Sequence, residues 1–168
     1  MADVFTHFNY LHTIPEIGMK EFKTSAYVAD VLKQLGYEVE TQIGGGTGVV
    51  AVCDSGKPGP VLGLRADMDA LGTKDGGAAH LCGHDGHMAM LLTAAKILAA
   101  HKDEWEGKVL LMFEEAEEMG ERGVGHLLSY LDEKKIHVDA CYGTHMMYCL
   151  PAGKVAVMYD GVLAGAFF

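Results

Sequence analysis

Short apolar runs that alternate with helical patterns constrain the fold of this chain more than any other feature of its sequence. Helical periodicity is found at about residues 21–35, 86–100 and 124–131. Runs of strand length are found at Tyr37–Ile43, Gly48–Cys53, Val61–Leu64, Val109–Phe113, Val138–Tyr142 and around Lys154–Met158. Because alternating strands and helices favour a parallel sheet covered on its faces, we predict a three-layer α/β/α fold with a mostly parallel sheet.

The composition is that of a folded domain with an acidic surface. The chain has 168 residues, 49% of them hydrophobic, which argues against a disordered acidic tail because this much apolar surface offsets the entropy of ordering. Its 13 Lys and Arg residues are scattered and outnumbered by 23 Asp and Glu residues, which gives a formal charge of −10. A nucleic-acid surface needs clustered basic residues, so small molecules or cations are the expected partners.

The chain has no sequence signal for a membrane or for secretion. Its first residues lack the basic head and apolar core of a signal peptide, and its uncharged stretches are too short or too polar to cross a bilayer. Four irregularly spaced cysteines are too few for a disulfide scaffold, so reduced thiols are expected. We therefore expect a soluble, cytoplasmic protein that binds neither membranes nor nucleic acids.

Polar clusters follow three of the expected strands directly. The clusters are Arg65–Asp69, Glu114–Glu118 and Thr144-His145. Ligands of open α/β sheets bind outside the carboxyl ends of the strands, so this recurrence predicts one composite site.

The segment from His80 to His87 is the densest in metal-binding side chains. Cys82 and His84 are two residues apart and would point the same way in an extended segment, and a thiolate with an imidazole suits zinc or a similar transition metal. The alternative is the start of a helix that Asp85 caps, with incidental histidines. His87 is expected to pack or to support a ligand.

Carboxylates form the second feature of the expected site. Five of them fall within eight residues, at Glu114, Glu115, Glu117, Glu118 and Glu121. They follow a buried strand without a turn, so at least one should face the sheet end, where one glutamate would bind a metal and its neighbour would accept a proton from water. The alternative is a solvated helix face.

Two further groups lie at strand ends. Asp67 and Asp69 share a face if their strand continues through them, and otherwise they form a solvated turn; Arg65 pairs with one of them in either case. A lone histidine such as His145 is more often a loop or core residue than a ligand, but its position after a third strand favours the site. The patterns of cysteine nucleophiles, of the serine elbow and of zinc deaminases are not found, so metal-dependent hydrolysis is favoured.

These residues fall within motifs that extend over nearly the whole chain. In chain order the motifs are Leu11-His12-x-x-Pro15-Glu16-Ile17-Gly18 with Glu21 and Thr24, Gly63–Leu71, Cys82–Ala89, Phe113 with Ala116–Glu118, and Gly143-x-His145 with Leu150-Pro151-x-Gly153. The string resembles the amidohydrolase branch of the aminoacylase/carboxypeptidase-type metallopeptidases. This branch includes hippurate hydrolases, N-acyl-amino-acid amidohydrolases, indole-acetyl-amino-acid hydrolases and aminobenzoyl-glutamate hydrolases.

The resemblance implies a role for each site residue. The metal ligands of a dinuclear site match Cys82, His84, Glu118 and His145. Glu117 matches the glutamate that activates water, and Asp69 matches the aspartate that supports a ligand. Asp67 stands where the wider clan has a histidine, so it is left outside the ligand set. The cofactors implied are two divalent ions, zinc, manganese, cobalt or nickel, which would polarise the scissile carbonyl together.

The implied reaction is hydrolysis of the amide bond of an N-acyl amino acid or an aminobenzoyl-glutamate-like substrate. Two departures from the family pattern are Glu114-Glu115 in place of Gln-Pro, and a loop between Asp69 and Cys82 that is shorter than in hippurate-type members. By the resemblance, residues 1–168 form the N-terminal part of a catalytic domain, without a lid domain and the C-terminal part. Self-association through an exposed apolar edge is expected. The alternatives are a metal-binding or assembly unit without activity and a purely structural α/β module.

Overall fold

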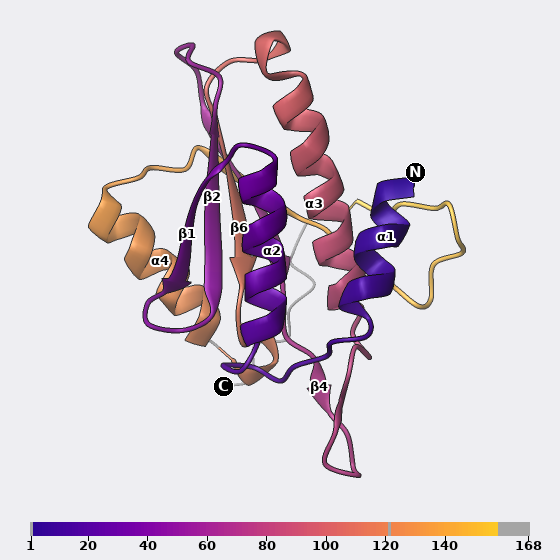
Figure 1. Ribbon diagram of the computed structural model, residues 1–168. Coiled ribbons are helices and arrows are strands. Elements are labelled where there is room, and N and C mark those ends of the chain that lie inside the picture. The colour runs from indigo at the N-terminus through magenta and orange to yellow at the C-terminus, as the bar shows by residue number, and fades with distance from the viewer. Residues whose placement is uncertain (1, 121, 158–168) are drawn as a thin grey trace.

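The structure is a computed structural model that describes residues 2–120 and 122–157 (Figure 1). Its helices are α1 (Ala2–Leu11), α2 (Phe22–Gln34), α3 (His84–Ala100) and α4 (Arg122–Lys134), with short 3-10 turns η1 (Lys102–Glu104) and η2 (Glu117–Met119). Its strands are β1 (Glu38–Ile43), β2 (Gly48–Asp54), β3 (Val61–Asp67), β4 (Leu71–Gly72), β5 (Ala78–Ala79), β6 (Lys108–Glu114) and β7 (Ala140–Gly143).

The main sheet has five strands in the order β1-β2-β6-β3-β7, and β4 and β5 form a separate small hairpin. β3 pairs in parallel with β6 on one side and with β7 on the other. β1 and β2 add antiparallel pairings, because the glycine-rich turn at residues 44–46 returns the chain directly beside β1. The sheet is therefore mixed, and the expected parallel arrangement is found in the half that carries the polar clusters.

Helices cover both faces of this sheet, which confirms the α/β class (Figure 1). One face packs against α2 and α3, with α1 lying against α3, around Leu32, Leu92 and Phe113. The other face packs against α4 around Leu110 and Leu127. Side chains of successive residues on β2 and β6 alternate between these two cores, as a strand between two helical layers requires.

Three helices and five strands of the main sheet lie where the apolar patterns predicted them. The helix α1 was not predicted. The strand expected around Lys154–Met158 is wrong for Lys154–Val157, which have no regular structure, and Met158 lies outside the described residues.

The start of α3 also differs from expectation. The helix begins at His84, and Gly83 precedes it in the left-handed region with a φ of 88°. Capping by Asp85 is therefore wrong: this residue is inside the first turn, where its carboxylate accepts hydrogen bonds from Gly86 N–H and from His12. A glycine can adopt the left-handed conformation without a steric penalty, which lets the helix begin early and buries the His84 side chain.

Among residues 2–120 and 122–157, no helix is both long enough and apolar enough to cross a bilayer.

Candidate metal centre

The predicted site residues gather at the edge of the sheet where its three parallel strands end. Asp67 ends β3 and pairs in register with Glu114, which ends β6. β7 ends at Gly143, two residues before His145. His84 opens α3 beside these strand ends, so the composite site predicted from the three polar clusters is formed in the structure.

His84 is the centre of the cluster, and its side chain is only 1% exposed. With Nδ1–H donating to Asp69 Oδ1 at 3.2 Å, the neutral ring keeps its lone pair on Nε2. Burial lowers the pKa of His84, but the hydrogen bond to Asp69 and the charges of Asp67 and Glu117 outweigh it and raise the pKa, so this position favours a positive charge. Among the described residues, the buried Nε2 atom has no hydrogen-bond partner. It faces carboxylate oxygens of Asp67 at 3.6 Å, Glu117 at 3.8 Å and Glu118 at 3.8 Å.

Asp69 links His84 to the carboxylate segment. Its Oδ2 accepts the backbone N–H of Glu118 at 3.0 Å while Oδ1 accepts His84. β3 stops at Asp67, so the two aspartates do not continue one strand, yet both reach His84. A carboxylate behind an imidazole fixes the ring tautomer and makes the opposite nitrogen a better metal ligand.

Cys82 and His145 also lie beside His84. Cys82 is in a bend and not in the extended segment that was expected, but its Sγ is 3.5 Å from His145 Nε2. The ligand atoms of Cys82, His84 and His145 all lie within 4.8 Å of one another. Burial, together with the Glu118 and Glu117 carboxylates, raises the pKa of Cys82 to about 12, so its thiol stays protonated at neutral pH without a cation nearby.

Glu117 and Glu118 lie at the end of β6, after Ala116, in the short turn η2. Their side chains are 39% and 26% exposed. Burial and the nearby Asp67 carboxylate raise the pKa of Glu117, although Arg65 and His84 oppose that shift. The other three members of the acidic run have different surroundings: Glu114 pairs with Arg65 at 2.6 Å, Glu115 is buried against the β1–β2 turn, and Glu121 lies outside the described residues.

Asp67 serves a different purpose from Asp69. Arg65 donates to it at 2.7 Å, as expected, and His87 Nδ1–H donates to it at 2.6 Å. Burial works against the charge of Asp67, but the hydrogen bond from His87 and the charges of His84 and Arg65 outweigh it and lower the pKa of Asp67 to about 2. His87 Nε2 then accepts the backbone N–H of Met146 at 2.7 Å, so both of its ring nitrogens are engaged.

The donor set fits a divalent transition metal. Cys82, His84 and His145 form one group of ligand atoms, and His84, Glu117 and Glu118 form another. Sulfur, imidazole and carboxylate ligands suit zinc and its neighbours in the first transition row. The free, buried Nε2 of His84 and the surplus of carboxylate charge around it are what a cation at this position would satisfy.

Sequence reasoning did not identify the partners of two residues that support this cluster. One is His87, which was expected to pack or to support a ligand and which accepts the N–H of Met146, the residue after His145. The other is Glu21, a fully buried carboxylate that binds the backbone of Ala116. His87 and Glu21 both belong to the motifs quoted above, but their partners lie 59 and 95 residues away, and no local pattern indicates such pairs.

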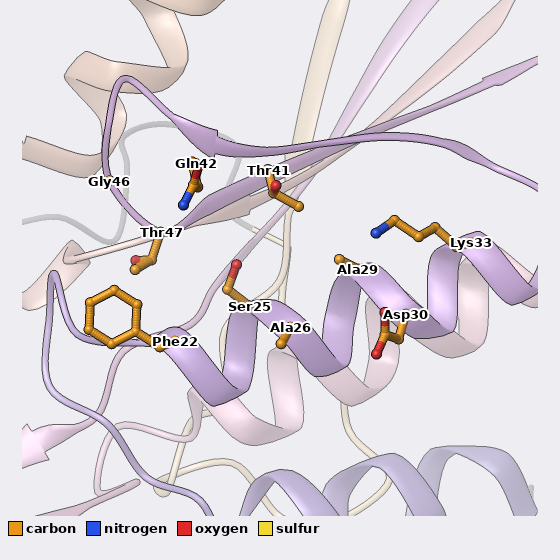
Figure 2. A pocket seen from close by; sticks show the side chains of 10 residues that line it. All are labelled: Phe22, Ser25, Ala26, Ala29, Asp30, Lys33, Thr41, Gln42, Gly46 and Thr47. Atoms are coloured by element: carbon orange, nitrogen blue, oxygen red, sulfur yellow. The ribbon is translucent and has the colours of Figure 1, made fainter.

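A separate groove of about 280 Å³ lies between α2 and the β1–β2 hairpin. Figure 2 shows Phe22 and Thr47 at one end of it and Lys33 at the other. None of the residues around His84 lines this groove. Thr47 lines it and also donates a hydrogen bond to Glu21.

The chain is similar in sequence to known carboxypeptidases and amidohydrolases. The chain is 38% identical over 165 residues to thermostable carboxypeptidase 1 of Saccharolobus solfataricus, covering 92% of this chain and 42% of that protein. It is 34% identical to the N-acyl-L-amino acid amidohydrolase of Geobacillus stearothermophilus, covering 97% of this chain and 46% of that protein.

A solved structure from Bacillus subtilis, YXEP, described as a dinuclear metal-binding peptidase of the M20 family, superimposes with a TM-score of 0.80 at 29% identity. The match covers 89% of this chain and 44% of that one, so this chain spans less than half the length of these relatives. Residues 63–159, which contain every predicted metal ligand, match the sequence profile of peptidase family M20/M25/M40. The chain belongs to this family.

Proposed function

We propose that this chain supplies the metal centre for hydrolysis of the amide bond of N-acyl amino acids. The observation that carries the proposal is the free, buried Nε2 of His84, which Asp69 orients and which faces three carboxylates. An imidazole held in this way is suited to bind a metal ion, because the three carboxylates around Nε2 stabilise a positive charge there.

The proposed ligands of two divalent ions are Cys82, His84, Glu118 and His145. A dinuclear centre is supported by the description of the related Bacillus subtilis structure and by the two overlapping groups of donor atoms around His84. Zinc, manganese, cobalt and nickel all suit this mixture of sulfur, nitrogen and oxygen donors. When bound, the ions would act as Lewis acids that polarise the scissile carbonyl.

Glu117 is proposed as the general base. Its carboxylate is close to His84 without a hydrogen bond to it, and burial and Asp67 raise its pKa, which makes it a stronger base than an exposed glutamate. Glu117 would take a proton from the attacking water and return it to the leaving amine nitrogen. Asp69 would hold His84 and the Glu118 backbone in place during this transfer.

The substrate class is proposed from the names of relatives. One of them is an N-acyl-L-amino acid amidohydrolase and another is a carboxypeptidase, and both names describe cleavage of an amide next to an amino acid. An N-acyl amino acid, hippurate included, is therefore the first substrate class to assay.

A second candidate function is binding of metal ions without turnover by this chain alone. It is favoured by the openness of the cluster, since His145 is exposed and the Glu117 side chain is 39% exposed. Catalytic metal sites exclude water to strengthen their electrostatics, and an open cluster lacks that advantage.

Metal analysis of the purified chain tests the centre itself. We expect up to two zinc or manganese ions per chain after purification without chelator, and a lower content in Cys82→Ala. Cys149→Ala is the matched control, because Cys149 is an exposed cysteine not found in any group of potential ligands among the described residues. Equal metal content in both variants and in the wild type would remove Cys82 from the site.

Hydrolysis assays separate the two candidate functions. With hippurate and other N-acyl amino acids, Glu117→Gln should keep its metal and lose activity by about 100-fold or more, since it removes the base and retains the ligands. Metal binding without turnover in the wild type, alone or with the C-terminal half of a relative, would favour the second candidate. Full activity in Glu117→Gln would overturn the role of Glu117.

A further inference from the structure

Glu21 is a fully buried carboxylate that the proposed mechanism does not use. It lies directly before α2 but makes no side-chain hydrogen bond to that helix. Its Oε1 accepts the backbone N–H of Ala116 at 2.8 Å, and its Oε2 accepts the hydroxyl of Thr47 at 2.5 Å. Burying a carboxylate costs free energy unless hydrogen bonds compensate it, and these two contacts supply that compensation.

The residue that Glu21 holds has a strained backbone. Ala116 is in the left-handed region, with φ 51° and ψ 38°, a conformation that is strained for a residue with a Cβ atom. It stands between the end of β6 at Glu114 and the turn that carries Glu117 and Glu118. The conformation of Ala116 therefore sets the direction in which both glutamates leave the sheet.

Neighbouring contacts hold Glu21 in position against this turn. A Cβ atom added to Gly18 would lie 3.0 Å from Ala116 Cα and 2.6 Å from Met119 Sδ, so the segment before α2 packs directly on the turn. The carboxylate of Glu16 accepts the N–H groups of Lys23 and Thr24, both at 2.9 Å, and thereby fixes the first turn of α2 behind Glu21.

Thr47, in the β1–β2 turn, contacts both Glu21 and the residue before Ala116. Its backbone N–H donates to Glu115, the residue before Ala116, while its hydroxyl donates to Glu21. Thr47 lies near Phe22 at one end of the groove in Figure 2, at the tip of the β1–β2 hairpin. Two buried carboxylates thus join the hairpin, the start of α2 and the turn after β6.

We propose that Glu21 is a positioning residue, which holds Ala116 in its left-handed conformation and so directs Glu117 and Glu118 toward His84. The inference rests on the proposed function, in which Glu118 is a ligand and Glu117 the base. It assigns a role at the metal centre to a residue that would not touch metal, substrate or water.

Amide hydrogen exchange in the metal-free chain tests the positioning directly. In Glu21→Ala we expect exchange at residues 116–119 to become at least tenfold faster. Glu21→Gln should stay within threefold of the wild type, because its carboxamide can accept from Ala116 N–H and donate to the Thr47 hydroxyl. Glu16→Ala is the matched control: it removes the carboxylate that binds the start of α2, so exchange should rise at Lys23 and Thr24 and not at Ala116.

Zinc affinity, measured by competition with a chromophoric chelator, is the second readout. The affinity should fall at least tenfold in Glu21→Ala and Glu21→Asp, and in Glu21→Gln it should stay within threefold of the wild-type value. A general loss of stability would not produce this pattern, because the control Glu16→Ala also weakens α2 and should keep its zinc affinity. Glu21→Asp, which shortens the side chain by one methylene, replaces Glu21→Ala in both readouts if the latter does not fold.

The outcomes separate this inference from the proposed function. Wild-type exchange rates at Ala116 in Glu21→Ala, or equal effects of Glu16→Ala and Glu21→Ala, would overturn the positioning role whether or not the chain binds metal. A wild-type chain that binds no zinc would overturn the proposed function, and the exchange rates would still decide whether Glu21 holds Ala116.

Discussion

The two sides of the candidate metal site are held by different means. On one side, the backbone that carries Glu117 and Glu118 is bound by buried carboxylates, since Asp69 accepts Glu118 N–H and Glu21 accepts Ala116 N–H. On the other side, His145 lies on an exposed segment after the edge strand β7, and a single imidazole, His87, accepts the neighbouring N–H of Met146.

The difference means that the backbone of the carboxylate side is preorganised, whereas the side with His145 is more adaptable. Hydrogen bonds in a low-dielectric interior are strong, and together they give the carboxylate side one geometry before any metal arrives. The exposed side has fewer buried contacts, so it opens at a lower cost in free energy. A metal ion would therefore meet His84 and Glu118 in place, and His145 would complete the site.

The largest effect is expected from Asp69, which belongs to both the imidazole and the carboxylate side. In Asp69→Asn one hydrogen-bond acceptor becomes a donor, so either His84 Nδ1–H or Glu118 N–H loses its partner. We expect zinc affinity to fall between 10-fold and 100-fold, as for other carboxylates that support a ligating histidine. Isothermal titration with zinc measures the loss.

Asp85→Asn is the control for this prediction. Asp85 is equally buried and lies next to His84 in the chain, but its carboxylate accepts from His12 and from Gly86 N–H. Similar zinc affinities for the two variants would mean that the hydrogen bonds of Asp69 to His84 and Glu118 do not support metal binding.

The second prediction concerns pH and the link to the exposed side. The pKa of Asp67 is lowered from 3.8 to about 2, with His87 the leading stabilising partner against the penalty of burial. A lowered folded-state pKa gives stability that is present above the unfolded pKa and is lost as the pH falls through the folded pKa. Between pH 5 and pH 2 the metal-free chain should therefore lose roughly 2 kcal/mol of unfolding free energy through Asp67.

Urea unfolding of wild type and Asp67→Asn across this range measures the contribution. The difference in unfolding free energy between the two proteins should shrink as the pH falls, because the asparagine cannot be protonated. A difference that is constant from pH 5 to pH 2 would contradict the charged state assigned to Asp67.

The sequence predicted the parts of this molecule that depend on local patterns. The alternation of apolar residues located β2, β3 and β6, and the polar residues after β3, β6 and β7 located one composite site. This worked because parallel strands that share a sheet must bring their carboxyl ends to one edge.

What the sequence could not predict depends on contacts between distant segments. The left-handed conformation of Ala116 has no local signature, since alanine ordinarily favours a right-handed helix, and its contact with the buried Glu21 joins residues that are far apart in the sequence. The antiparallel pairing of β1 with β2 follows from the tight turn at residues 44–46, whose three glycines are typical of a turn but do not indicate the direction of the next strand. Residues Lys154–Val157 alternate like a strand but have no neighbouring strand with which to pair in the described part of the chain.

The smallest effect is expected from His87, because it acts on the more adaptable side. In His87→Phe the N–H of Met146 and the carboxylate of Asp67 both lose a partner, so His145 should sample more positions and zinc affinity should fall about tenfold. If His87 affects zinc binding through its link to Met146, His145→Ala should cost at least as much and the double variant should cost no more than His145→Ala alone. Additive losses in this cycle would show that His87 contributes by another route, such as its hydrogen bond to Asp67.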